Sequence, residues 1–136
     1  MNPICRISML AFLCCSFLTG CAHAIIASPG NEGIHSNQNG DYFAFYPIPM
    51  SQATTAAKLA LKQTGMAYDA EISHTPSQTI LAGLSTTQYV MKVTLDAVNP
   101  NLTKVTVHAD YFGEEALSLR FQHLLASAIK KAGGTH

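Results

Sequence analysis

The clearest structural signal in the chain is the stretch from Tyr89 to Tyr111, which reads YVMKVTLDAVNPNLTKVTVHADY. On both sides of the central Asn-Pro-Asn, apolar and polar residues alternate one by one. This alternation is typical of β-strands, in which successive side chains point to opposite faces. The stretch therefore predicts an antiparallel hairpin with one buried face and one face in water.

The turn also predicts the register of this hairpin. If the turn is centred on Pro100, Asp96 lies opposite Lys104 and Thr94 lies opposite Thr106. Cross-strand pairs of these kinds each stabilise a sheet by ~0.2–1 kcal/mol. Both pairs favour this register.

The segments around the hairpin complete an α+β pattern. Further strands are expected at Tyr42–Tyr46, which Pro47 and Pro49 end, at Met66–Ser73, and at Thr79–Leu84, where Gly83 weakens the pattern. Helices are expected at Gln52–Thr64, capped by Ser51 and closed by Gly65, and at Glu114–Ala132, ended by Gly133. The order β-α-β-β-β(-β)-α predicts an antiparallel sheet of four to five strands with two helices packed on one face.

Both predicted helices are amphipathic. The first carries a face of mostly methyl-sized side chains: Ala53, Ala56, Ala57, Ala60 and Leu61. The second repeats larger apolar residues every three and four positions: Leu117, Phe121, Leu124, Leu125, Ala128 and Ile129. Because its apolar face is so thin, we expect the first helix to lie very close to the sheet.

The overall charge excludes one class of partner. The chain has 136 residues and a formal charge of zero, with eight basic and eight acidic residues. Such a chain lacks the basic surface that nucleic-acid binding relies on, so no nucleic-acid partner is predicted.

The N-terminus has the pattern of an export signal. Arg6 precedes the apolar segment Ile7–Leu18, which suits a secretory signal and is too short to span a membrane. The segment ends in Leu18-Thr19-Gly20-Cys21, which resembles the lipobox of bacterial lipoproteins. The resemblance implies cleavage between Gly20 and Cys21 and lipidation of the Cys21 thiol. The alternative is an ordinary signal peptide, cut at a nearby site such as Ala22-His23-Ala24.

The other cysteines agree with this interpretation. Cys5, Cys14 and Cys15 lie in the part that would be removed, so only Cys21 remains and no disulfide is expected. Ala22 follows Cys21, and the retention rule for lipoproteins then favours the outer membrane, with the domain facing the periplasm. We expect a signal peptide at 1–20, a flexible tether at 21–40, an α+β domain at 41–132 and a frayed tail at 133–136.

Several motifs resemble a known family. They are the lipobox, the turn from Leu61 to Gly65, the hairpin Val93–Val107 with its Asn-x-Thr turn, and Phe112-Gly113-Glu114-Glu115-Ala116-Leu117-Ser118. Together they are similar to a family of small bacterial lipoproteins catalogued as domain of unknown function number 3568. The resemblance covers about Phe43–Ile129 and implies the fold and an envelope location. It implies no reaction, because none is established for the family.

The sequence contains no strong catalytic or metal-binding motif. Serines and threonines are plentiful, but none lies in a Gly-x-Ser-x-Gly or Ser-x-x-Lys motif. The best candidate base is His108, with Asp110 and Glu114 nearby, although it falls on the wet face of its strand. His108 and Asp110 with His74 or His123 would be a loose metal set beside the tight spacing of structural zinc sites. We therefore predict no catalytic residue, no metal and no cofactor.

Three functions are compatible with these observations. The first is a lipid-anchored, non-enzymatic envelope module that binds an envelope protein, a cell-wall component or a lipid. The second is a carrier or sensor of an apolar ligand, held in a groove between sheet and helices that some of the domain's nine aromatic rings would line. The third is a cell-wall hydrolase that uses His108 with Asp110 or Glu114 as acid–base groups. We expect the first.

Overall fold

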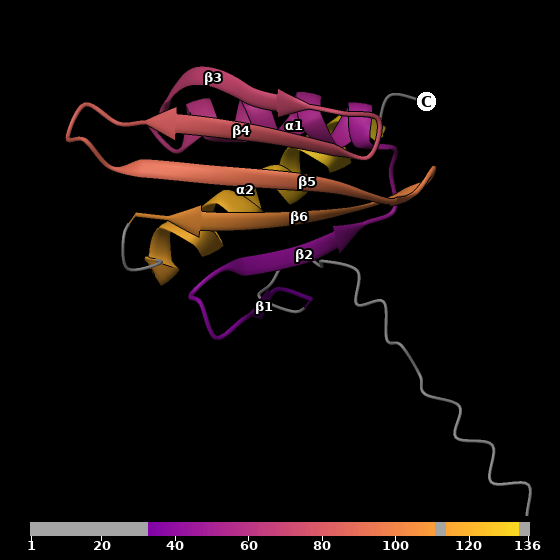
Figure 1. Cartoon of the computed structure of the whole chain (residues 1–136), viewed down its shortest axis with the longest axis horizontal. Coiled ribbons are helices and arrows are strands. Elements are labelled where there is room, and N and C mark those ends of the chain that lie inside the picture. The colour runs from indigo at the N-terminus through magenta and orange to yellow at the C-terminus, as the bar shows by residue number, and fades with distance from the viewer. Residues whose placement is uncertain (1–32, 111–113, 134–136) are drawn as a thin grey trace, which may run out of the picture.

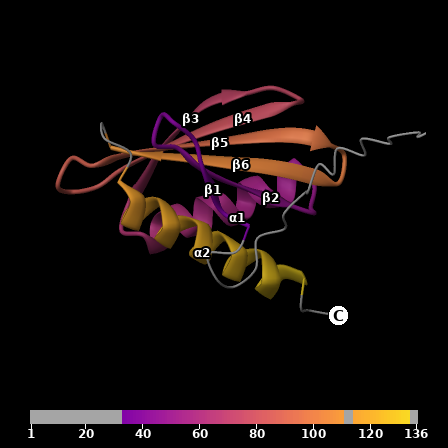
Figure 2. The ribbon, with the colours of Figure 1, turned by 90° about the horizontal axis from the view of Figure 1, so that it is seen from below.

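The computed structural model describes residues 33–110 and 114–133, which form one antiparallel sheet and two helices (Figure 1). In chain order the elements are β1 (His35–Ser36), β2 (Tyr42–Tyr46), α1 (Met50–Gln63), β3 (Ala67–His74), β4 (Gln78–Leu84), β5 (Val90–Asn99), β6 (Leu102–Ala109) and α2 (Glu115–Gly133). The strands lie side by side in the order β1-β2-β6-β5-β4-β3. Both helices cover the same face of the sheet and leave the other face open (Figure 2).

The predicted α+β class is confirmed, but the predicted number of strands is wrong. The sheet has six strands rather than four to five. The additional strand, β1, has two residues and pairs His35 with Phe43. So short a strand has no alternation that a sequence pattern can detect. It lies within residues 21–40, where we expected a tether, so the described part of that range adds a strand to the edge of the sheet.

The central hairpin, β5 and β6, has the predicted register. Asp96 pairs with Lys104, and Thr94 pairs with Thr106. The alternation also places the faces as expected, because the apolar set points toward the helices. Its members are fully buried: Met91, Val93, Leu95, Val105, Val107 and Ala109.

Helix α1 begins two residues before the predicted Gln52, and Ser51 does not cap it. The residue before the helix is Pro49, in an extended conformation with φ −60° and ψ 148°. Its carbonyl oxygen accepts hydrogen bonds from the backbone N–H groups of Gln52 and Ala53, each at 3.1 Å. Proline already fixes a φ that suits the start of a helix, so the chain turns into α1 without a side-chain cap.

The small apolar face of α1 is confirmed, and all five of its predicted residues are buried. This face approaches the sheet closely at Gly83 of β4. A Cβ atom added to Gly83 would lie 3.0 Å from Cβ of Met66 and 3.1 Å from Cδ2 of Leu61. The glycine that weakened the strand prediction therefore makes room for the end of α1 and the residue that follows it.

Helix α2 presents its apolar stripe to the sheet and to α1. Phe121, Leu125 and Ala128 are buried, together with the polar Ser118 and Gln122. Glu115 lies in the first turn, and Lys130 and Lys131 lie in the last, as the helix dipole favours. Within residues 33–110 and 114–133, neither helix is long and apolar enough to cross a membrane.

Candidate functional site

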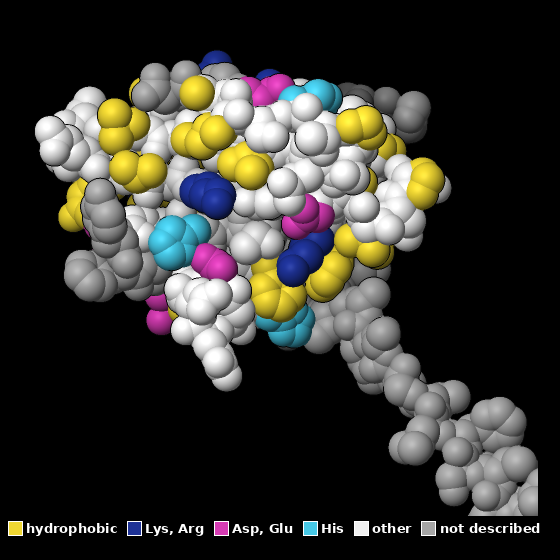
Figure 3. Space-filling model, in the orientation of Figure 1, with side chains coloured by type: hydrophobic (Ala, Val, Ile, Leu, Met, Phe, Trp, Pro, Cys, Tyr) yellow, Lys and Arg dark blue, Asp and Glu magenta, His cyan; other side chains and the backbone are white. Residues whose placement is uncertain are grey.

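The open face of the sheet carries hydrophobic, basic, acidic and histidine side chains side by side (Figure 3). On β2, the ring of Phe43 stacks against His35, with the ring centroids 5.4 Å apart, and lies edge-on to Phe45 at 6.1 Å. The ammonium of Lys104 lies 4.6 Å from the centre of the Phe43 ring. This cation–π contact and the paired rings place Phe43 and Phe45 on the outer surface of the sheet. These two rings therefore do not line the internal groove that the apolar-ligand hypothesis requires.

His108 lies on this open face, and its partner is a carboxylate from a distant part of the chain. Its Nδ1 lies 2.6 Å from Oδ1 of Asp41, which is 67 residues earlier in the sequence. The other oxygen of Asp41 accepts a hydrogen bond from Nδ2 of Asn37 at 2.8 Å. The sequence hypothesis placed Asp110 or Glu114 in this role, whereas the structure places Asp41 there. The contact ties the β1–β2 turn to strand β6.

The geometry around His108 lacks one part of a nucleophilic site. An Asp–His pair can orient an imidazole as a base, but acyl transfer also needs a nucleophile within hydrogen-bonding distance. Among the hydrogen bonds of the described residues, none joins His108 to a serine or threonine hydroxyl. The structure shows the pair as a contact between the β1–β2 turn and strand β6.

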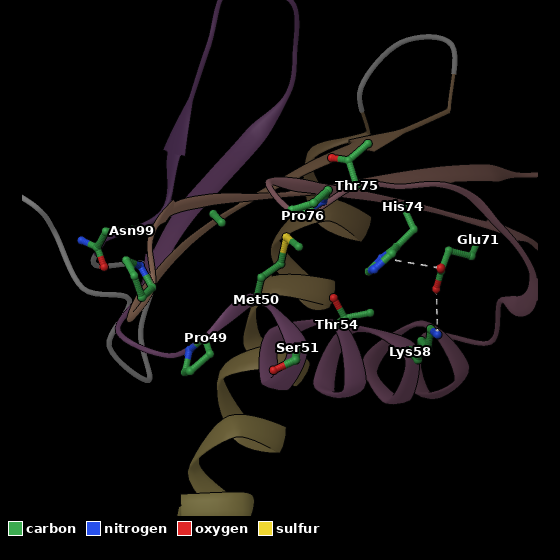
Figure 4. Close-up of a pocket in the computed structure, with 12 residues that line it drawn as sticks. Pro49, Met50, Ser51, Thr54, Lys58, Glu71, His74, Thr75, Pro76 and Asn99 are labelled. Atoms are coloured by element: carbon green, nitrogen blue, oxygen red, sulfur yellow. Dashed lines mark hydrogen bonds and ion pairs between the residues drawn. The ribbon is translucent and has the colours of Figure 1, made fainter.

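A second cluster lies in a hollow of about 510 Å³ beside the start of α1 (Figure 4). Glu71 of β3 contacts Lys58 of α1, with Oε2 and Nζ 3.0 Å apart, and its Oε1 lies 3.7 Å from Nδ1 of His74. The same Nδ1 lies 2.9 Å from the hydroxyl of Thr79. Because both contacts of His74 use one nitrogen and Thr79 is fully buried, the cluster cannot work as a relay to an accessible nucleophile. It joins α1 to the edge of the sheet.

The histidines considered as metal ligands lie on three different elements. His74 belongs to β3, His108 to β6 and His123 to α2. Among the residues that the structure describes, no group of three or more His, Cys, Asp or Glu side chains is arranged to hold a metal ion.

A larger hollow lies between the two helices. It has a volume of about 810 Å³ and lies at the start of α1 and the end of α2. Its apolar lining comes from Ile48, Ala56, Leu59, Ala128, Ile129 and Ala132, and its polar lining from Ser51, Gln52 and Thr55. We call it the helix groove. Leu59 is 47% exposed there.

The helix groove differs from the groove named in the apolar-ligand hypothesis. That hypothesis placed a groove between sheet and helices, but core side chains fill that layer. The hollow lies instead where the small side chains of α1 face the last turns of α2. Volumes of ~300–1,000 Å³ with apolar walls and a few polar groups are typical of small-molecule sites.

A buried polar cluster was missed by the sequence reasoning. The side chain of Gln122 is fully buried and accepts a hydrogen bond on Oε1 from the Tyr46 hydroxyl at 2.7 Å. Burial raises the pKa of the Tyr46 phenol above its ordinary value. The one sequence feature that could have indicated the burial of Gln122 is its position directly after Phe121, at the margin of the apolar stripe of α2. The cluster has no access to solvent and serves packing.

Tyr42 is the second tyrosine with a shifted pKa. Partial burial, the negative charge of Glu115 and a hydrogen bond to that carboxylate all raise the pKa of the Tyr42 phenol. Both tyrosines are therefore neutral at physiological pH, and neither is activated as a nucleophile.

The lipidation and cleavage residues predicted from the sequence, Gly20 and Cys21, lie outside the described residues. The same holds for the whole predicted signal peptide at 1–20, for residues 21–32 of the predicted tether and for residues 134–136 of the predicted tail.

Comparison with protein-family models finds a match over residues 4–132 to a family described as "Protein of unknown function (DUF3568)". The match is longer than the resemblance seen in the sequence and includes the whole N-terminal apolar segment. None of the curated proteins compared with the chain matches it.

Proposed function

The chain belongs to the DUF3568 family, and on that premise we propose that it is a lipid-anchored protein of the bacterial cell envelope that acts by binding rather than by catalysis. One observation carries the proposal. The motif Leu18-Thr19-Gly20-Cys21 directly follows an apolar segment of secretory length. A cysteine in this position is the acceptor for lipid in bacterial lipoproteins.

The physical chemistry of the anchor supports this role. Each buried CH₂ of an acyl chain contributes ~0.8 kcal/mol to membrane binding, so two or more chains hold a small protein stably at a bilayer. The segment between Cys21 and the first described residue, Gly33, supplies a connection to the domain. Ala22 after the cysteine favours the outer membrane, with the domain in the periplasm.

The binding role is supported by the distribution of surfaces in the domain. The helices cover one face of the sheet, and the other face exposes hydrophobic, basic and histidine side chains (Figure 3). Surfaces that combine apolar and polar side chains are common in protein interfaces. A hydrolase remains the least supported alternative, because none of the hydrogen bonds described gives His108 a nucleophile.

A second candidate function is the carriage of an apolar ligand. The helix groove favours it, because its volume of about 810 Å³ and its aliphatic walls suit an acyl chain or a similar molecule. In that case, the lipid anchor would keep the carrier close to the source of its ligand.

The anchor is tested by metabolic labelling with a palmitate analogue in a bacterium that expresses the full chain. We expect label in the wild-type protein and recovery with the membrane fraction, and loss of both in Cys21→Ser. Cys15→Ser is the matched control, because this thiol lies in the predicted signal peptide and should not affect labelling. Label retained in Cys21→Ser, or a mature N-terminus after Ala24, would contradict the proposal.

A further inference from the structure

Four side chains form a compact array at the centre of the open face. In the register of β5 and β6, Lys92 lies opposite His108, and Thr94 lies opposite Thr106. Directly paired residues have Cβ atoms ~4.5–5.5 Å apart, and residues two apart along a strand are separated by ~6.5–7 Å. The four side chains therefore rise from the corners of a rectangle of roughly 5 by 7 Å on one face of the sheet.

The β1–β2 turn forms a wall beside this array. Asn39 and Asp41 from the turn, together with the four side chains, line a hollow of about 330 Å³. The position of the wall is fixed by the contact between Asp41 and His108 and by hydrogen bonds within the turn. Asn37 Oδ1 accepts one from the backbone N–H of Asn39 at 2.9 Å and another from that of Asp41 at 3.0 Å.

Of the hydrogen-bonding groups in the hollow, the acceptor already has partners, whereas most of the donors have none. The one carboxylate, Asp41, already has a partner on each oxygen, namely His108 and Asn37. Within the described residues, the side chains of Lys92, Thr94 and Thr106 have no hydrogen bond or ion pair. The positive charge of Lys92 thus has no anion of its own, whereas Lys104 on the same face lies over the Phe43 ring and opposite Asp96.

From this arrangement we infer that the hollow binds a phosphate group. The ammonium of Lys92 supplies charge, and the two threonine hydroxyls supply further donors around one point. A phosphate is compact enough to fit between the four corners and has enough acceptor oxygens to use them together. The contact with Asp41 places a proton on Nδ1 of His108, so Nε2 of the neutral ring can accept a hydrogen bond from a protonated phosphate oxygen. This inference does not depend on the lipid anchor.

The test is an NMR titration of the full chain in neutral detergent micelles with inorganic phosphate, at constant ionic strength maintained with chloride. We expect saturable shifts of the Lys92, Thr94 and Thr106 amides and of the His108 ring. Lys92→Gln should weaken binding roughly tenfold or more, since a hydrogen bond to a charged group contributes ~1.5–3 kcal/mol. Lys104→Gln is the matched control on the same face and should weaken it less than about twofold.

Two results would overturn the inference. One is the absence of saturable shifts at these residues. The other is equal weakening by both lysine variants, which would show a general effect of surface charge. If binding is found, a parallel titration with glycerophosphoglycerol identifies the source of the phosphate. Tighter binding of this phosphodiester points to a lipid headgroup, and tighter binding of the inorganic ion points to free phosphate.

Discussion

At the scale of single residues, Gln122 connects helix α2 to two strands through one side chain. Its Oε1 accepts a hydrogen bond from Tyr46, and its Nε2 donates to the carbonyl oxygens of Val105 at 3.1 Å and Tyr42 at 3.4 Å. A buried polar group without partners costs ~1–3 kcal/mol, so these bonds specify how α2 sits on the sheet. Ser118 in the same helix is the opposite case, because its buried hydroxyl has no hydrogen-bond partner among the described residues.

This contrast gives a prediction for Tyr46→Phe. The substitution keeps the ring but leaves Oε1 of Gln122 buried without its donor, so we expect the free energy of unfolding to fall by ~1–3 kcal/mol. Urea unfolding at neutral pH measures it. Ser118→Ala is the control, since it removes a hydroxyl that makes no hydrogen bond. The free energy of unfolding of this variant should be unchanged or slightly higher. Equal losses in the two variants would show that the Tyr46 bond contributes nothing specific.

The same variant should remove a dependence on alkaline pH. Because burial raises the pKa of Tyr46, the folded protein keeps this proton to a higher pH than the unfolded chain, whose tyrosines titrate near pH ~10. The stabilising contribution is therefore fully present below pH ~10 and is lost as the pH rises from there toward the folded pKa. The free energy of unfolding, measured from pH 8 to 11, should fall less steeply above pH 10 in Tyr46→Phe than in the wild type.

At the scale of elements, the distance between α1 and the sheet is set by small residues on both sides. The helix contributes a face that is mostly alanine, and β4 contributes Gly83, which is buried beneath Leu61 and Met66. Glycine weakens a strand, so its presence in β4 is explained by the close approach of the neighbouring layer.

Gly83→Ala tests this explanation. The added methyl group would lie 3.0 Å from Cβ of Met66, which is too close without movement of the backbone or of α1. Overpacking of this kind costs ~1–3 kcal/mol, and we expect a loss of that size in the free energy of unfolding. In Gly133→Ala, the matched control, the new Cβ would meet nothing within 4 Å, so stability should stay the same or rise. An unchanged stability in Gly83→Ala would show that the layers can separate freely.

At the scale of the whole molecule, the fold separates two kinds of surface. The helix layer carries the apolar helix groove, and the opposite face of the sheet carries the smaller hollow at His108. Since the sheet lies between them, both surfaces can be occupied at the same time. Figure 2 shows the sheet edge-on, with both helices on one side of it.

Native mass spectrometry of the lipidated protein in neutral detergent tests whether the helix groove carries a ligand. We expect an adduct of lipid mass that disappears on denaturation and is lost in Leu59→Asp, because a carboxylate in the groove is costly beside an acyl chain. Leu84→Asp is the control, since Leu84 is comparably exposed, at 40%, but does not line the groove. An adduct that persists in Leu59→Asp would place the ligand elsewhere, and a wild type without any adduct would leave binding through the surface as the better account.

The sequence by itself determined the elements whose signal is local. The alternation around Pro100 was sufficient for the strands β5 and β6, their inward faces and their register, because the side-chain period of a strand repeats every two residues. The alanine face of α1 could also be predicted, because apolar residues recur at helical spacing within this one segment. The prediction of lipidation at Cys21 also comes from sequence alone, since the motif is contiguous.

Only the tertiary structure decided which distant residues meet. Asp41 rather than Asp110 is paired with His108, because β2 lies beside β6 and brings the β1–β2 turn to that strand. Gln122 is buried because the end of β2 and the middle of α2 face each other across the core. The helix groove depends on how α1 and α2 pack. These features arise from contacts between elements, and no periodic pattern within one element contains that information.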